Sequence, residues 1–258
     1  MGERRGADVV RCEVDGAVGR LTIARPEKLN ALSRAVLEGL ADGAAWFDAR
    51  PEVKVVVVSG DGRAFSAGFD LADRTWAELG PPERSAEVGR AMAEAVAGMR
   101  ALTIASVRGH CVGGGVVLAA SCDLRVVADD VRFRIPEVDL GIPLFWTGTP
   151  RLVRELGPAL TKELVLTGRA FEAEEAKAIR FANRVVPLAE LDAATDALAA
   201  ELAAKPGFVL RTTKVQVELA SPSVPAADGG TTADLRDFAE ALADPEGRTT
   251  AATYRRPG

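Results

Sequence analysis

Two stretches of small residues could supply backbone hydrogen-bond donors in place of reactive side chains. They are AFSAGFDL, residues 64–71, and CVGGGVVLAA, residues 111–120. Glycine lets the backbone approach a ligand closely, and the first amides of a helix have no partners inside the helix. The amides of Phe69 and Gly114 are therefore candidate donors. Two donors that converge on one acyl or thioester oxygen would stabilise its developing negative charge by about 3–4 kcal/mol each.

Histidine and cysteine usage narrows the chemistry further. His110 is the only histidine, so a metal site built from several imidazoles is excluded and a Ser-His-acid triad would need His110 itself. We expect His110 to be a packed, hydrogen-bonded residue. Cys12, Cys111 and Cys122 have no CxxC spacing and apolar surroundings, which is typical of reduced, packed thiols in a reducing compartment.

Composition excludes several classes of partner. The 258 residues are 48% apolar, enough for one substantial core, and one compact domain is the default expectation. The net charge of −5 and the scattered basic residues argue against nucleic-acid binding. No stretch approaches the roughly 20 apolar residues of a membrane span, and the N-terminus lacks the apolar part of a signal peptide. We therefore expect a cytoplasmic protein without a membrane anchor.

The first half of the chain contains the elements that must position these loops. Residues 9–23 alternate around Asp15-Gly16, which predicts a hairpin with a tight turn. Ser33 is placed as the N-cap of a helix that runs to Pro51. Residues 53–60, VKVVVVSG, are continuously apolar and β-branched, which indicates a strand covered on both faces.

The remaining chain alternates strands and helices and then becomes helical. Residues 72–83 predict a polar surface segment before a helix at about 86–101, and residues 102–109 predict another buried strand. Gly113 to Gly115 mark a change from strand to helix. LRVVA (124–128) and VRFRIP (131–136) predict short strands, which suggests repeated ββα units. From Thr147 onward the pattern is almost entirely helical.

Five motifs occur in order along the chain and carry a family resemblance. They are RPEKLNAL (25–32), AFSAGFDL (64–71), GHCVGGGVVLAASCD (109–123), PEVDLGI (136–142) and TGRAFEAEEAKA (167–178). The sequence from about residue 10 to about residue 250 resembles the enoyl-CoA hydratase/isomerase family, the crotonases. The resemblance implies an α/β crotonase-like (ClpP/crotonase) fold, a spiral of repeated ββα units over residues 1–195. It also implies a helical region over residues 196–258 that covers the site and mediates homotrimers, often paired into hexamers.

The resemblance further implies an acyl-CoA thioester as substrate, whose carbonyl oxygen accepts hydrogen bonds from the amides of Phe69 and Gly114. Coenzyme A is then part of the substrate, and no separate cofactor or metal is expected. Asp70 could instead cap a helix, and Lys28 could be a solvated loop charge. The coenzyme A moiety is expected to contact Arg25, Lys28, Leu29, Ala67, Gly68, Asp70 and Leu71.

The hydratases of the family that this sequence resembles use two glutamates, and the sequence has a glutamate at only one of the two matching positions. Val117 stands at the first position, one helical turn beyond Gly114. Glu137 stands at the second, after Pro136, where we expect it at the end of a strand beside the glycine helix. Apolar neighbours would disfavour its charged form and suit it to acid/base work. Asp139, two residues on, would share the same face if the segment were extended.

A second departure lies in LGIPLFWTGTPRL, residues 140–152, where Phe145 and Trp146 make the pocket wall bulky. Val117, Pro136 and Phe145 are expected to contact the substrate. One carboxylate and an aromatic wall look like the family's isomerases, which convert 3-enoyl-CoA to 2-enoyl-CoA. Two alternatives stay open, an enoyl-CoA hydratase and a catalytically silent acyl-CoA-binding protein.

Overall fold

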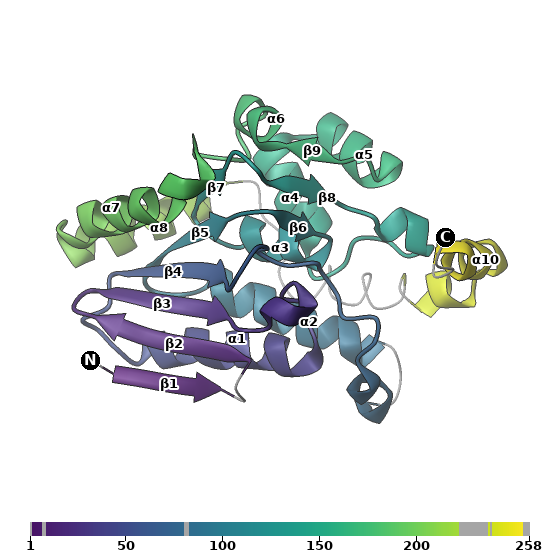
Figure 1. Ribbon diagram of the computed structural model, residues 1–258, viewed down its shortest axis with the longest axis horizontal. Helices are drawn as coiled ribbons and strands as arrows, with labels where there is room; N and C mark the ends of the chain where they lie inside the picture. Colours follow the sequence, from purple (N-terminus) through teal and green to yellow (C-terminus); the bar gives the residue numbers. More distant parts are fainter. Residues whose placement is uncertain (1, 7–8, 80–82, 222–236, 238, 255–258) are drawn as a thin grey trace.

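A large, mostly parallel sheet forms the centre of the computed structural model, which describes residues 2–6, 9–79, 83–221, 237 and 239–254 (Figure 1). The strand order is β1-β2-β3-β4-β5-β7-β10. The first three strands are antiparallel and the others parallel. Their bounds are β1 Gly2–Gly6, β2 Val10–Asp15, β3 Val18–Ile23, β4 Val55–Gly60, β5 Leu102–Val107, β7 Leu124–Ala128 and β10 Arg184–Val186.

A second, smaller sheet lies beside the first and supports the glycine loop. It pairs β6 (His110–Val112) with β8 (Arg132–Arg134) in parallel, and β8 with β9 (Phe171–Glu172) in antiparallel fashion. The amide of Gly113 donates to the carbonyl oxygen of Arg134 at 2.8 Å. This bond joins the start of the glycine loop to the end of β8.

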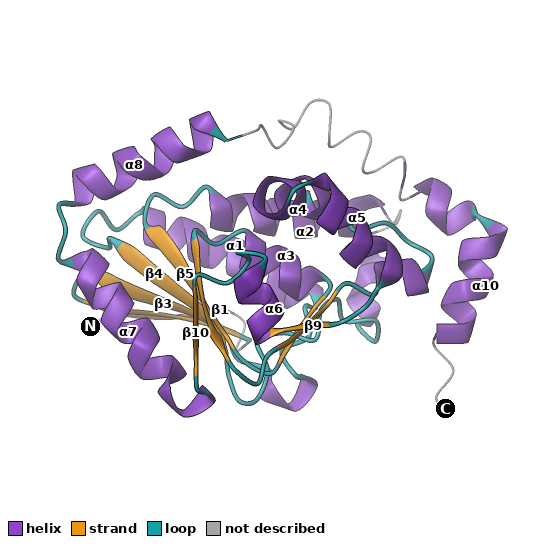
Figure 2. Cartoon of the chain, turned by 90° about the horizontal axis from the view of Figure 1, so that it is seen from above, coloured by secondary structure: helices purple, strands orange, loops and turns teal. Residues whose placement is uncertain are grey.

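Helices cover both faces of the large sheet (Figure 2). On β4, Val56 and Val58 belong to the core shared with α1 (Arg34–Asp48), α2 (Glu83–Ala97) and α3 (Gly114–Ala120). The alternate residues Val55 and Val57 pack against α7 (Leu191–Ala203). The alternation follows from the two-residue period of a strand, and it confirms the expectation of a strand buried on both faces.

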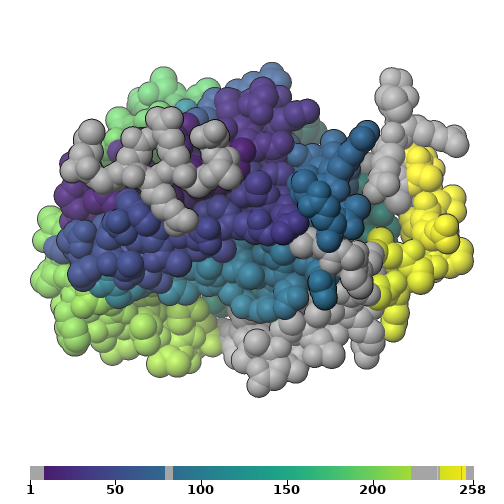
Figure 3. Space-filling model, turned by 90° about the horizontal axis from the view of Figure 1, so that it is seen from below, coloured from purple at the N-terminus to yellow at the C-terminus, as the bar shows by residue number. Residues whose placement is uncertain are grey.

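The remaining helical elements are short or peripheral. In Figure 3, α10, in yellow, lies at one end of the molecule and the green helices α7 and α8 lie at the other. The bounds are η1 Pro26–Lys28, η2 Arg74–Leu79, η3 Glu137–Leu140, α4 Gly148–Leu156, α5 Pro158–Thr167, α6 Ala173–Ala178, η4 Leu188–Glu190, α8 Gly207–Ala220 and α10 Pro245–Tyr254.

Several predicted elements are confirmed. The hairpin joins β2 and β3 with Asp15 paired to Val18, and Gly16 has a φ of +57° in the turn. The Ser33 side chain accepts from the amide of Val36 at 3.4 Å and caps α1. Two strands followed by a helix recur as β2-β3-α1, β5-β6-α3 and β7-β8-α4, which is the expected ββα repeat.

Other expectations differ from the structure. The helix expected at about 86–101 spans Glu83–Ala97 and ends before Gly98. Within the polar segment 72–83, η2 forms at 74–79, whereas residues 80–82 lie outside the described part of the chain. β9 and β10 interrupt the region expected to be helical. Strands of two and three residues are too short to produce a periodic pattern, so the sequence does not predict them. The boundary expected between residues 195 and 196 lies inside α7. The division into two regions stays a prediction, because parts of 196–258 lie outside the described residues.

The prediction for His110 is wrong, whereas the prediction that the cysteines are packed in the interior is confirmed. His110 is exposed, because it opens β6 with its side chain on the outer face while Cys111 points inward. Cys12, Cys111 and Cys122 are all buried, and none of them forms a disulfide bond.

Candidate active site

Backbone pairing brings the two small-residue loops side by side. The amide of Ser66 donates to the carbonyl oxygen of His110 at 3.0 Å, and the amide of Val112 donates to that of Ser66 at 3.0 Å. Gly68, with a φ of +85°, has no room for a side chain: a Cβ there would lie 2.6 Å from the carbonyl oxygen of Val112 and 3.7 Å from the amide nitrogen of Gly114. The loop that carries Phe69 therefore packs directly against the start of α3.

The amides of Phe69 and Gly114 are free to donate to a ligand. Leu32 pairs with both neighbours of Phe69: its amide donates to Gly68 at 2.7 Å, and its carbonyl accepts from Asp70 at 3.1 Å. The Phe69 amide consequently faces away from this bridge. Gly114 is the first residue of α3 and has no helical acceptor. Among the described residues, neither amide donates to a protein acceptor.

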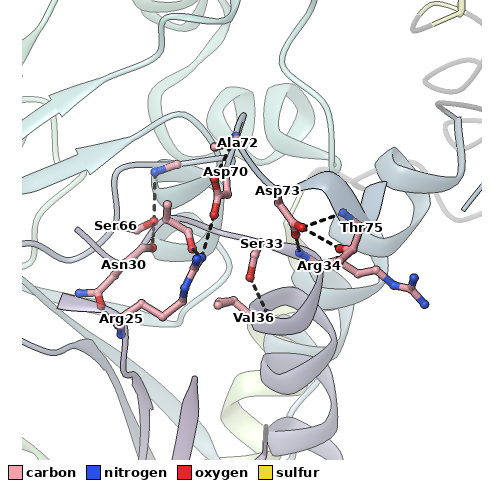
Figure 4. Close-up of polar contacts among 12 residues, drawn as sticks. Arg25, Asn30, Ser33, Arg34, Val36, Ser66, Asp70, Ala72, Asp73 and Thr75 are labelled. Carbon is pink, nitrogen blue, oxygen red and sulfur yellow. Dashed lines mark hydrogen bonds and ion pairs between the residues drawn. The ribbon is translucent and has the colours of Figure 1, made fainter. Parts of the chain in front are cut away.

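A network of polar contacts fixes the loop around Phe69 (Figure 4). Arg25 Nη1 donates to Asp70 Oδ2 at 3.0 Å and to the carbonyl oxygen of Ala31 at 2.7 Å. Ser66 Oγ donates to the carbonyl oxygen of Asn30 at 2.9 Å. Asp70 begins no helix; its Oδ1 accepts from the amide of Ala72 at 3.1 Å in a turn. Arg25 and Asp70, both expected at the coenzyme A moiety, bind each other.

Glu137 faces the glycine loop from the first position of η3. A Cβ on Gly113 would lie 2.4 Å from Glu137 Oε1, so the carboxyl group packs against the glycine backbone. Glu137 Oε2 is buried and has no hydrogen-bond partner in the described part of the chain. Burial raises the pKa of Glu137 from 4.5 to about 7, because the charged form loses its hydration. Near neutral pH this carboxyl group can both accept and donate a proton.

One cavity of about 70 Å³ joins these groups. Phe69, Gly114 and Glu137 line it together with Val117 and Phe145, five of the residues expected from the sequence to be catalytic or to contact the substrate. Trp146, expected in the bulky wall, lines it as well. Its remaining lining residues are Ser85, Ala86, Ile142 and Leu144.

Ser85 and Ala86 were missed from the sequence. They lie in the first turns of α2, more than 15 residues after Phe69, and no local motif marks them. Only the packing of α2 against α3 brings them to the cavity. The one signal that could have found them is the amphipathic pattern of α2 itself.

Glu137 is the only carboxylate that lines this cavity among the described residues. Val117 lies one turn beyond Gly114, buried and packed near Gly148. The expectation that Asp139 could share a face with Glu137 is wrong, because the segment is a 3-10 helix and not extended. Asp139 instead pairs with Arg134 at 2.7 Å near the surface.

The other residues predicted at the substrate lie outside the cavity lining. Lys28 is exposed in η1, and Leu29 ends that element with a φ of +50°. Leu71 is half exposed, Ala67 partly exposed and Pro136 buried. Ala67 and Leu71 lie two residues from Phe69 along the chain, Pro136 directly precedes Glu137, and Lys28 and Leu29 belong to a different loop. Their contact with the substrate stays a prediction.

No group of three or more His, Cys, Asp or Glu side chains among the described residues is arranged to hold a metal ion. None of the helices in the described ranges is long and apolar enough to cross a membrane.

Comparison with known proteins gives concordant matches. A family model described as enoyl-CoA hydratase/isomerase matches residues 13–249. A probable enoyl-CoA hydratase of Mycobacterium bovis is 36% identical over 187 residues, 71% of each chain. A crotonyl-CoA hydratase of Syntrophomonas wolfei is 32% identical over 195 residues, 75% of each chain.

Solved structures agree in fold. A candidate enoyl-CoA hydratase from Thermobifida fusca YX, in complex with acetoacetyl-CoA, has a TM-score of 0.74 and 33% identity over 92% of this chain and 94% of that one. An enoyl-CoA hydratase from Mycobacterium avium subsp. paratuberculosis K-10 has a TM-score of 0.85 at 24% identity, covering 95% and 98% of the two chains. The second match concerns the fold alone.

Proposed function

The chain belongs to the enoyl-CoA hydratase/isomerase family, and on that premise we propose that it binds an acyl-CoA thioester with the carbonyl oxygen between the amides of Phe69 and Gly114. The observation that carries this proposal is that both residues and Glu137 line the same cavity. The Thermobifida fusca relative was solved with acetoacetyl-CoA and with CoA, which supports the same ligand class here. In the proposed function coenzyme A is part of the substrate, and no separate cofactor is required.

The reaction proposed is isomerisation of a 3-enoyl-CoA to a 2-enoyl-CoA. The Glu137 carboxylate removes a proton from C2, and the electron pair of that C–H bond delocalises through the carbonyl group and the C3–C4 double bond. The two amides stabilise the resulting dienolate oxygen. The same carboxyl group then returns the proton to C4, which leaves the double bond between C2 and C3. One carboxylate with a pKa of about 7 suffices for both steps.

Hydration of a 2-enoyl-CoA is the second candidate, since the named relatives are hydratases. That reaction needs a group that holds the water as well as one that transfers the proton. Val117 offers no such group. The only other polar side chain in the described lining is Ser85, which makes hydration the weaker candidate on geometry.

The C-terminal helices are proposed to join copies of this chain into a homotrimer, or a hexamer made of two trimers. Helix α8 has an apolar face open to solvent, with Phe208 exposed at 71% and Leu219 at 82%. Apolar side chains exposed in a row are typical of a surface that a second copy covers. Size-exclusion chromatography with light scattering tests this directly; a monomer at micromolar concentration would contradict it. We also propose a cytoplasmic location.

One experiment separates the candidate functions. The purified protein is incubated with 2-enoyl- and 3-enoyl-CoAs, and products are followed by ultraviolet absorbance and mass spectrometry. Isomerisation changes the absorbance of a 3-enoyl-CoA at constant mass, whereas hydration adds the mass of water to a 2-enoyl-CoA. Binding without turnover would select the third reading, a catalytically silent acyl-CoA-binding protein, and refute both enzymatic proposals.

A further inference from the structure

Trp146 is wedged between two helices at the cavity. A Cβ on Gly89 of α2 would lie 2.0 Å from Trp146 Cε2, and a Cβ on Gly114 of α3 would lie 2.2 Å from Trp146 Cζ3. The indole thus contacts the backbone of both helices, and Trp146 is only 7% exposed. Its ring centroid is 6.2 Å from that of Phe69. Glycine on both sides is what makes room for the indole.

The backbone holds this side chain in an unusual conformation. Trp146 and Thr147 have φ angles of +61° and +57°, a region that bulky and β-branched residues rarely adopt. Thr147 Oγ1 donates to the carbonyl oxygen of Trp146 at 2.5 Å and accepts from Arg151 Nε at 3.2 Å. These bonds keep the turn in place and aim the indole at the cavity. Strain of this kind persists where the surrounding structure fixes it, and it concentrates at functional sites.

The space that Trp146 leaves is small. The cavity measures about 70 Å³, against roughly 300 Å³ at the low end for pockets that hold drug-sized ligands. A cavity of this size has room for only a short acyl chain beside the thioester carbonyl. Apart from Glu137 and Ser85, its described lining is apolar, which suits a hydrocarbon chain and not a polar one.

We propose that Trp146 closes the acyl end of the site and restricts the substrate to short-chain acyl-CoA thioesters. This proposal rests on the function proposed above and narrows it to a substrate class. Trp146 acts through volume alone, because its indole fills the space between α2 and α3 into which a longer chain would extend. It is a specificity-determining residue and takes no part in proton transfer.

The test compares the affinities of saturated butyryl-, hexanoyl-, octanoyl- and decanoyl-CoA by calorimetry, so that no turnover is needed. The unmodified protein should bind butyryl-CoA at least about tenfold more tightly than octanoyl-CoA, since one methylene group changes discrimination by about 10–200-fold in a tight apolar pocket. Trp146→Gly removes the indole and suits the left-handed backbone. It should shift the preference to hexanoyl- or octanoyl-CoA, whereas the matched control Trp46→Ala, in α1 and outside the cavity lining, should keep the parent's preference.

The outcomes distinguish the two proposals. Equal binding of butyryl- and octanoyl-CoA by the unmodified protein would overturn the role of Trp146 while the acyl-CoA function stands. An unchanged preference in folded Trp146→Gly would overturn it as well. Failure to bind any acyl-CoA would overturn the proposed function and this inference with it. If Trp146→Gly does not fold, Trp146→Phe serves in its place, with a smaller shift in the same direction expected.

Discussion

The two walls of the cavity are built on different principles. The wall formed by residues 66–70 and 112–115 offers backbone amides, and its side chains serve mainly to hold the loops together. The wall formed by residues 137–147 offers side chains: a buried carboxyl group and a bulky indole. In the proposed function, the first wall binds the carbonyl oxygen that all acyl thioesters share, and the second wall selects the acyl chain and carries out the reaction. Changes in the first should therefore affect all substrates alike, and changes in the second should discriminate among reactions and chains.

Glu137→Gln should have the largest effect on rate. The amide is nearly isosteric with the carboxyl group but cannot accept the C2 proton, so turnover should fall by about 10²–10⁴-fold while acyl-CoA binding persists. The matched control is Asp139→Asn in the same element, near the surface, where an ion pair contributes little. Turnover of Glu137→Gln at the parent's rate would show that the second wall does not supply the base.

Gly68→Ala tests the first wall. The new Cβ would lie 2.6 Å from the carbonyl oxygen of Val112, so the loop must move and displace the Phe69 amide. Loss of one oxyanion donor costs about 10²–10³ in rate, and every acyl chain length should suffer equally.

Gly16→Ala is the matched control for that change. Gly16 also has a positive φ, but nothing lies within 4 Å of the position of its Cβ. It should lower stability by about 1–2 kcal/mol, the cost of a left-handed residue, and leave kcat/KM unchanged. Equal losses of activity in both variants would mean that the collision at Gly68 has no specific consequence.

The buried carboxyl group should also reduce stability at neutral pH. The pKa of Glu137 rises from 4.5 to about 7 on folding, so the folded protein binds more protons than the unfolded chain between those values. The free energy of unfolding therefore falls as pH rises through this window. Glu137→Gln removes this dependence. The free energy of unfolding of the variant, relative to that of the parent, should therefore increase by about 2–3 kcal/mol between about pH 5 and about pH 8. Urea unfolding at both pH values measures it; a difference between variant and parent that is the same at both would refute the buried, partnerless carboxyl group.

The first wall was predictable from the sequence because its chemistry depends on where glycine stands. The spacing of Gly68, Gly113 and Gly114 predicts both donor amides. Ser33 correctly predicts the start of α1, and the valines of β4 correctly predict a buried strand. Local signals of this kind depend on backbone geometry, which residue type constrains directly.

The second wall was predictable only in part, because it depends on contacts between distant segments. Glu137 was identified through its motif, but its 3-10 helix was not, and Asp139 was misplaced as a result. The wedge between Gly89 and Gly114 could not be foreseen, because neither glycine marks a turn and only the packing of α2 against α3 gives them a common neighbour. The three-residue strand β10 is not predicted for a similar reason, since its pairing with β7 is not visible in its own sequence.

Infrared spectroscopy of a bound acyl-CoA tests most directly whether the two amides hold the thioester carbonyl. Glu137→Gln is the protein to use, because a substrate bound to it remains intact. If the amides of Phe69 and Gly114 donate to the carbonyl oxygen, the C=O bond weakens and its stretch moves to lower frequency than in water. The same measurement on the double variant that adds Gly68→Ala should lose most of that shift. A bound thioester whose carbonyl stretch equals its value in water would contradict the account.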